Sequence, residues 1–84
     1  MDIQFTESAL RDYEYWKKTD DKKTERIKKL CADIQKKPFE GIGKPEPLKF
    51  SLQGYWSRRI DKIHRLIYKI NDATIVVISC RYHY

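Results

Sequence analysis

The sequence predicts an α+β fold in which two N-terminal helices pack on a twisted antiparallel sheet. Residues 55–84 are rich in β-branched and aromatic residues, and polar breaks at positions 61–62 and 71–72 divide them into three strands of a meander. The first half of the chain instead shows apolar residues at helical spacing, interrupted by a turn signal at positions 19–21. A short link between two helices implies a helical hairpin across one face of the sheet.

The first two elements are predicted from local spacing. Ile3 and Phe5 alternate with polar residues over positions 2–5, which is typical of a short strand. Thr6 is the predicted N-cap of the first helix, because its side chain can accept a backbone N–H bond at that position. The apolar stripe of this helix consists of Ala9, Tyr13 and Trp16.

The second helix combines an apolar stripe with a basic outer face. The stripe consists of Ile27, Leu30, Cys31 and Ile34. Pro38 ends the helix, because the residue before a proline avoids helical geometry. The other faces carry Lys22, Lys23, Arg26, Lys28, Lys29, Lys36 and Lys37. Such a face is either ordinary solvated surface or a contact for nucleic acid.

A loop rich in proline and glycine is predicted at positions 38–47, which contain all three prolines and two of the three glycines. Pro45 and Pro47 flank Glu46 and restrict its backbone. A carboxylate held in this way, with Lys44 and Lys49 close by in the chain, could be positioned for chemistry, or it could be an ordinary exposed glutamate. After the loop, a short strand before the turn at position 54 is predicted from the alternation of Leu48, Phe50 and Leu52.

The C-terminal strands have an apolar and a basic alternation. Pairing Ile60 with His64 places Arg59 opposite Arg65 on the basic face. The apolar set consists of Trp56, Ile60, Leu66, Tyr68, Ile70, Val76, Ile78 and Cys80. The other set consists of Arg59, Arg65, Lys69, Ser79, Arg81 and His83, with Ile67, Ile75 and Val77 among them. Two arginines opposite each other repel, so this face is either a solvated basic surface or a site for a polyanion.

The predicted register leaves three positions in the strands to be explained. Arg58 falls on the apolar side, which suits only a place at a sheet end. Tyr82 shares the alternation of Cys80 and is predicted to point into the core, where it would hold the last strand. Pairing Ile70 with Thr74 would place Arg65 opposite Ser79, so strand twist, a bulge or closure on a ligand must bring His83 toward Arg65.

Composition predicts one small, basic domain over residues 1–84. The net charge of +6 and the pI near 9.4 favour a polyanionic or acidic partner. Cys31 and Cys80 lie in apolar stripes and are predicted to be small buried hydrophobes in a reducing compartment. The chain has neither an apolar run long enough to span a membrane nor the apolar segment of a signal peptide, so the cytoplasm is the expected location.

The motifs narrow the chemistry. The sequence has no phosphate-binding or dinucleotide-binding glycine pattern, and His64 and His83 lack the spacing of zinc ligands. We therefore predict no metal site and no cofactor. One constrained glutamate, one C-terminal histidine and several arginines suit metal-free ribonuclease chemistry. In that chemistry a base takes the proton from the 2′-OH, an acid protonates the leaving 5′-oxygen and cations stabilise the phosphorane.

Five longer motifs together resemble a known family. They are Asp12-Tyr13 with Tyr15-Trp16, the run from Pro38-Phe39-Glu40-Gly41 to Gly43-Lys44-Pro45-Glu46-Pro47-Leu48-Lys49, Gly54 with Trp56-Ser57-Arg58-Arg59-Ile60, His64-Arg65-Leu66 with Tyr68, and Cys80-Arg81-Tyr82-His83-Tyr84. In their order and over the whole chain, they resemble the YoeB/Txe toxins of bacterial toxin–antitoxin modules, within the RelE/ParE superfamily.

The resemblance implies a microbial-ribonuclease-like, RelE-type fold and a ribosome-dependent endoribonuclease that cleaves mRNA in the decoding site. It implies that Glu46 is the general base, that Arg65 stabilises the transition state and that His83 is the general acid. The terminal residue, Tyr84, would help to shape the site. The expected RNA contacts are Lys44, Lys49, Arg59 and Arg81.

The resemblance also implies partners. Toxins of this family are neutralised by a cognate antitoxin, they bind operator DNA only as the toxin–antitoxin complex, and they can form homodimers. Two other functions stay open at this point. One is a non-catalytic inhibitor that binds a protein target such as gyrase, which would not need Glu46, Arg65 and His83 together. The other is a basic nucleic-acid-binding module without chemistry.

Overall fold

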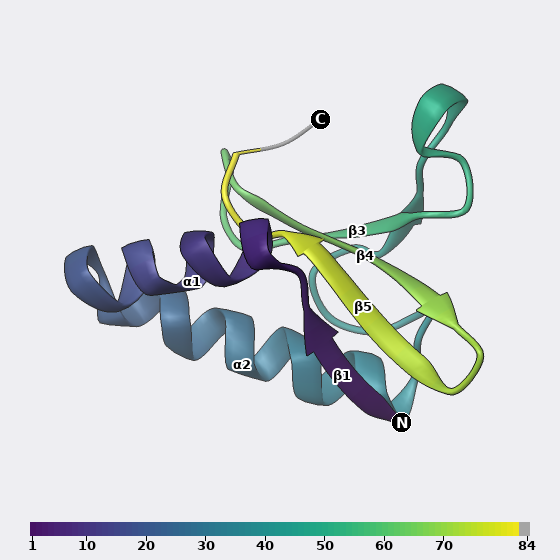
Figure 1. Cartoon of the computed structure of the whole chain (residues 1–84), viewed down its shortest axis with the longest axis horizontal. Coiled ribbons are helices and arrows are strands. Elements are labelled where there is room, and N and C mark those ends of the chain that lie inside the picture. The colour runs from purple at the N-terminus through teal and green to yellow at the C-terminus, as the bar shows by residue number, and fades with distance from the viewer. Residues whose placement is uncertain (83–84) are drawn as a thin grey trace.

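The computed structural model describes residues 1–82 of the chain (Figure 1). The elements in chain order are β1 (Asp2–Phe5), α1 (Glu7–Thr19), α2 (Asp21–Lys36), β2 (Glu46–Pro47), the 3-10 helix η1 (Phe50–Leu52), β3 (Trp56–Arg59), β4 (Arg65–Asn71) and β5 (Thr74–Ser79). The strands form one sheet in the order β1-β5-β4-β3-β2, and α1 and α2 lie side by side along it. The predicted α+β fold, with two helices on a mostly antiparallel sheet, is confirmed.

One strand departs from the antiparallel pattern. β1 pairs with β5 in parallel, with Ile3 opposite Ile75, whereas every other neighbouring pair is antiparallel. Alternation of side chains is the same in both kinds of pairing, so the sequence could predict the strand but not its direction. The parallel arrangement is reached because the two helices carry the chain away from β1 before the sheet continues.

α1 begins directly after its predicted N-cap, Thr6, and α2 begins within the predicted turn at positions 19–21. The Thr6 hydroxyl accepts the N–H of Ala9 at 3.2 Å, and the Asp20 carboxylate accepts the N–H of Lys22 at 3.0 Å. Their stripes meet the sheet in a core formed by Ala9, Trp16, Ile27, Leu30, Ile34, Ile60, Leu66, Tyr68, Ile75, Val77 and Cys80. Each large apolar side chain in it stabilises the fold by roughly 1.5–3 kcal/mol. Within residues 1–82, no helix has the length and apolar character that a bilayer crossing requires.

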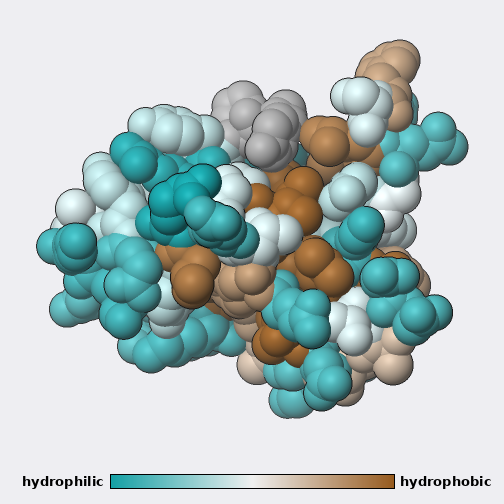
Figure 2. Space-filling view, in the orientation of Figure 1, coloured by the Kyte–Doolittle hydropathy of each residue, from teal (hydrophilic) through white to brown (hydrophobic). Residues whose placement is uncertain are grey.

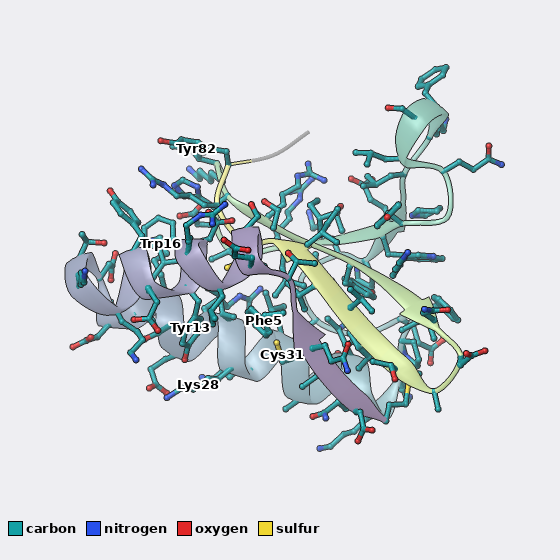
Figure 3. All side chains as sticks on the ribbon, viewed as in Figure 1. Phe5, Tyr13, Trp16, Lys28, Cys31 and Tyr82 are labelled. Carbon is teal, nitrogen blue, oxygen red and sulfur yellow. The ribbon has the colours of Figure 1, made fainter. Side chains whose placement is uncertain are left out.

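A shallow apolar cleft is lined by residues of α1, α2 and β1. It has a volume of about 320 Å³, and its lining includes Phe5, Tyr13 and Cys31 (Figure 3). Figure 2 shows apolar side chains exposed here among hydrophilic ones. The Phe5 and Tyr13 rings meet edge to face with centroids 5.8 Å apart. Because they line this cleft, Tyr13 and Cys31 are only half-buried although they belong to the apolar stripes.

The residues of β5 that face the core differ from those predicted. Ile75 and Val77 are completely buried, whereas Val76 and Ile78, which the alternation assigned to the core, are half-buried. A shift in the β4–β5 register leaves Ile78 as an extra residue on β5, which is a β-bulge. The extra residue inverts the alternation once, so Cys80 is buried as predicted.

The predicted pairing of Ile70 with Thr74 is wrong, because Ile70 lies opposite Ile75. This shift of one residue and the bulge together determine where Arg65 lies relative to the end of the chain. Ile67 is opposite Ser79, where the predicted register placed Arg65. The N–H of Arg65 donates instead to the carbonyl of Tyr82 at 2.8 Å. Arg65 therefore lies beside the last residue before His83, which itself is outside the described part of the chain.

Tyr82 does not enter the core, contrary to the prediction. Its φ of +63° lies in the left-handed region, which turns the side chain away from the alternation of the strand. The residue is 58% exposed, and its hydroxyl accepts a hydrogen bond from Arg81 Nη2 at 3.0 Å. Its ring lies 5.4 Å from that of His64.

The short strand predicted from Leu48, Phe50 and Leu52 is wrong. The strand at this place is β2, and the hairpin to β3 already closes where the N–H of Leu48 donates to the carbonyl of Tyr55 at 2.9 Å. The residues between must turn, and they form η1. Phe50 has a φ of +59° and is 91% exposed on this projecting loop (Figure 1).

The two cysteines are free thiols, as predicted. Cys80 is completely buried and Cys31 is half-buried. Burial raises the pKa of Cys31 to about 11 and, together with the charge of Asp12, raises the pKa of Cys80 to about 12. Both thiols are therefore protonated and poorly reactive near neutral pH.

Asp61 holds the turn between β3 and β4. Its Oδ1 accepts the N–H groups of Ile63 at 2.8 Å and His64 at 2.6 Å, and its Oδ2 pairs with Lys23 Nζ at 3.0 Å. Partial burial alone would raise the pKa of Asp61, but the hydrogen bonds from His64, Lys23 and Ile63 outweigh it and lower the pKa to about 2.

We expect Asp61→Asn to remove a part of the stability that depends on pH. Because the pKa of Asp61 falls from its ordinary value of 3.8 to about 2 on folding, the contribution is complete above roughly pH 4 and is lost as pH falls through about 2. The variant should lose roughly 1–2 kcal/mol of unfolding free energy at neutral pH, and urea titrations should show this deficit narrowing in acid. Asp72→Asn, in the exposed β4–β5 turn, is the control. A deficit that stayed constant down to pH 2 would contradict this assignment.

Candidate active site

Glu46 and Arg65 meet on the sheet face opposite the helices. Glu46 pairs with Ser57 across β2 and β3, which places their side chains on one face. Arg65 Nη1 donates to Glu46 Oε1 and, at 3.3 Å, to Ser57 Oγ. Ser57 is completely buried, whereas the side chains of Glu46 and Arg65 are 52% and 27% exposed. The carboxylate and the guanidinium are thus fixed against each other and still open to a ligand.

Arg59 adds a second guanidinium to this face. It lies opposite Arg65 in the β3–β4 register, as predicted, and it is exposed. Its backbone is held from two sides, because its N–H donates to the carbonyl of Gly43 at 2.7 Å and its own carbonyl accepts Arg26 Nη2 at 3.1 Å. Two arginines and one carboxylate leave the face with an excess of positive charge, which suits a phosphate group.

Arg58 is the buried arginine that holds the loop in front of Glu46. The prediction that it sits at a sheet end is wrong, because it lies within β3 and is completely buried. All five of its N–H groups are used. The acceptors are the Tyr68 hydroxyl (3.2 Å), Asp33 Oδ2 (2.5 Å) and the carbonyls of Lys37 (2.6 Å), Glu40 (3.0 Å) and Ile42 (3.2 Å). The hydrogen bond from Arg58, with that from the N–H of Ile42, lowers the pKa of Asp33.

Two glycines allow the loop to approach this ion pair. Gly41 has a φ of +127°, and a Cβ there would lie 2.0 Å from Asp33 Oδ2. Gly43 has a φ of +81°, and a Cβ there would lie 2.8 Å from a Leu30 methyl carbon. A side chain at either position would push the loop away from Arg58. The loop is therefore fixed at both glycines just before it enters β2 and delivers Glu46.

The other predicted RNA contacts are spread around the pair. Lys44 and Lys49 are exposed on either side of β2 in the chain. Arg81 turns instead toward α1, where its guanidinium carbon lies 3.5 Å from the centre of the Tyr15 ring. His83 and Tyr84, the predicted general acid and the residue that shapes the site, lie outside the described residues.

Sequence reasoning missed three residues that build the site. Ser57 supports the Glu46–Arg65 pair from below, and only the register of a two-residue strand could have revealed it. Arg58 did give a signal, because a charged residue in an apolar alternation requires a buried acceptor. His64 accepts a hydrogen bond from Tyr82, which depends on the bulge in β5.

The chemistry of the described site is that of an acid–base group beside a cation. A carboxylate can take a proton, and a guanidinium can bind a phosphate in two-point geometry. Over residues 1–82, no three His, Cys, Asp or Glu side chains gather as a metal-binding group.

Two helices on one face of a mostly antiparallel sheet, with a carboxylate–arginine pair on the other face, define a RelE-type toxin fold. Residues 5–84 match the family described as YoeB-like toxin of bacterial type II toxin–antitoxin system. The chain belongs to this family.

Similar proteins cover the chain from end to end. A toxin YoeB of Streptomyces coelicolor is 55% identical over 84 residues, which are 100% of both chains. The YoeB/ParE toxin from Agrobacterium tumefaciens is 44% identical, with a TM-score of 0.97 over 100% of both chains. Two structures from Staphylococcus aureus, a YoeB dimer and a heterotetrameric YoeB–YefM toxin–antitoxin complex, are 45% identical, with TM-scores of 0.93 and 0.92 over 100% of this chain and 98% of theirs.

Proposed function

We propose that this protein is the toxin of its type II module and acts in the cytoplasm as a ribosome-dependent endoribonuclease, cleaving mRNA in the decoding site and so inhibiting translation. The observation that supports this best is the contact between the accessible Glu46 carboxylate and Arg65, next to a second exposed arginine, Arg59. This is a proton acceptor and a phosphate-binding cation within one site.

In the proposed mechanism, the scissile phosphate binds Arg65 and competes with Glu46 for its guanidinium. The freed carboxylate takes the proton from the 2′-OH, and the 2′-oxygen attacks phosphorus. Arg65 stabilises the phosphorane, and the bond to the 5′-oxygen breaks as His83 protonates that oxygen. The products are a 2′,3′-cyclic phosphate and a 5′-OH, and Tyr84 shapes the site around them. The RNA supplies its own nucleophile, so no cofactor is required.

Ribosomes programmed with a defined mRNA provide the test. Incubation with the protein, followed by mapping of the 5′ ends, should show discrete cuts in ribosome-bound mRNA and far fewer in the same mRNA alone. Inhibited translation of intact mRNA would instead identify a non-catalytic inhibitor. RNA binding with neither effect would identify a binding module.

The proposed protein partner is a cognate antitoxin with an acidic segment that folds on binding. The net charge of +6 favours such a partner, and the S. aureus relative forms a heterotetramer with YefM. Operator DNA would be bound by the toxin–antitoxin complex alone. The YoeB dimer from S. aureus likewise supports a homodimer of this chain.

Lys49 and Arg59 should contribute to RNA affinity through phosphate contacts. Removing one such contact, as in Lys49→Gln or Arg59→Gln, should flatten the slope of log affinity against log salt by roughly 0.7 for single-stranded RNA. Filter binding over a salt series measures the slope, and Lys17→Gln on the outer face of α1 is the control. Unchanged slopes in both variants would move the RNA-binding surface elsewhere, for instance to the lysines of α2.

A further inference from the structure

The imidazole of His64 contacts two aromatic rings, just before β4 begins. It meets Trp16 edge to face with ring centroids 4.7 Å apart, and the centroid of the Tyr82 ring lies 5.4 Å from that of the imidazole. Figure 3 shows Trp16 and Tyr82 at the same end of the molecule. The backbone of His64 is fixed as well, because Asp61 accepts its N–H at 2.6 Å. The ring therefore has a defined position and orientation.

Three hydrogen bonds hold the backbone of the last described residues. Trp16 Nε1 donates to the carbonyl of Cys80 at 2.8 Å, and Arg65 N–H donates to the carbonyl of Tyr82 at 2.8 Å. Between them, the N–H of Tyr82 donates to His64 Nδ1 at 2.7 Å. In the bond to His64, a side chain accepts the backbone N–H of Tyr82, the residue that directly precedes His83. This bond also sets the tautomer, because Nδ1 can accept only when the ring proton is on Nε2.

The conformation of Tyr82 makes this bond important. A φ of +63° at a residue other than glycine costs roughly 1 kcal/mol and persists only where the surroundings impose it. Tyr82 as a residue is 58% exposed, so packing in the core does not supply that constraint. His64 Nδ1 accepts the N–H of Tyr82 and the Arg65 N–H donates to its carbonyl, so both backbone polar groups of Tyr82 are hydrogen-bonded.

We propose that His64 is a positioning residue for RNA cleavage. By accepting the N–H of Tyr82, it holds the left-handed conformation of the residue that directly precedes His83 in the chain. The proposal rests on the proposed function, in which His83 is the general acid. A donor group misplaced by about 1 Å costs roughly 100-fold in rate, so a single hydrogen bond two residues from the chain's end can govern catalysis.

Two substitutions separate hydrogen bonding from packing. His64→Asn and His64→Leu form a matched pair, because each places one atom near the position of Nδ1 and only the asparagine oxygen accepts a hydrogen bond. We expect the leucine variant to lose roughly 10- to 100-fold in single-turnover cleavage of ribosome-bound mRNA, with ribosome affinity unchanged. The asparagine variant should stay within about threefold of wild type. Equal loss in both variants, or loss in neither, would overturn the proposal.

A measurement on the free wild-type protein is independent of cleavage and of how the variants fold. A nitrogen–nitrogen coupling across the hydrogen bond from the Tyr82 amide to His64 Nδ1 should be detectable by NMR, and its absence would overturn the positioning role. Failure of the wild-type protein to cut ribosome-bound mRNA would refute the proposed function instead. The coupling would then still decide whether His64 holds the end of the chain.

Discussion

Glu46→Gln should lower the single-turnover rate of mRNA cleavage by roughly 100-fold or more, the usual loss when an acid–base group is removed. The amide keeps the shape of the side chain and an oxygen that can accept from Arg65, so the arrangement around Ser57 should persist. It cannot take the proton of the 2′-OH. Ribosome binding and the free energy of unfolding should change little, because the Glu46 side chain is half-exposed.

Glu40→Gln is the matched control for this variant. Glu40 lies in the same loop, and its exposed side chain pairs with Lys37 at 3.4 Å. Its link to Arg58 is made by the backbone carbonyl, which the substitution leaves in place. We expect the control to cleave at the wild-type rate. Wild-type cleavage by Glu46→Gln would show that the proton goes elsewhere, for instance to a group on the ribosome.

Arg58→Met should destabilise the fold by roughly 3–5 kcal/mol, because it removes the completely buried partner of an ion pair together with hydrogen bonds to three carbonyl groups. Methionine fills much of the space but leaves Asp33 and three loop carbonyls without their donor. That loss is a large part of the 5–15 kcal/mol that typically holds a small protein together. Urea unfolding should show a lower midpoint, with the slope unchanged if the denatured state is the same.

Arg59→Met provides the comparison for that experiment. The two arginines are neighbours in β3, but Arg59 points to the opposite face and is exposed. Its loss should change the unfolding free energy by less than about 0.5 kcal/mol. Equal stabilities of the two variants would mean that the loop before Glu46 is held by its glycines and prolines and not by the buried guanidinium.

Local patterns predicted those parts of the fold that local chemistry determines. Thr6 caps α1 because of its own side chain, and the stripe of α2 is buried because its spacing matches one helix face. The pairing of Arg59 with Arg65 was predictable because the turn between β3 and β4 is short and a slip would mix the two faces. These features depend on residues close together in the chain.

The features that escaped prediction depend on contacts between distant parts of the chain. The extra residue Ile78 in β5 is set by the whole β4–β5 pairing, and Phe50 turns away because the hairpin has already closed behind it. Arg58 is tolerated in the core because Asp33, 25 residues earlier, meets it there. For the candidate site, the sequence pointed to Glu46 and Arg65 but not to Ser57, which is buried and accepts a hydrogen bond from Arg65.

Attack by the 2′-OH is the central claim, and an mRNA with a 2′-deoxynucleotide at the mapped cleavage position tests it most directly. On programmed ribosomes, the protein should cut the all-ribose mRNA to a 2′,3′-cyclic phosphate and a 5′-OH and should leave the substituted mRNA intact at that position. Cleavage of the 2′-deoxy mRNA at the wild-type rate would contradict the proposed roles of Glu46, Arg65 and His83, because the attacking oxygen would then come from water and not from the RNA.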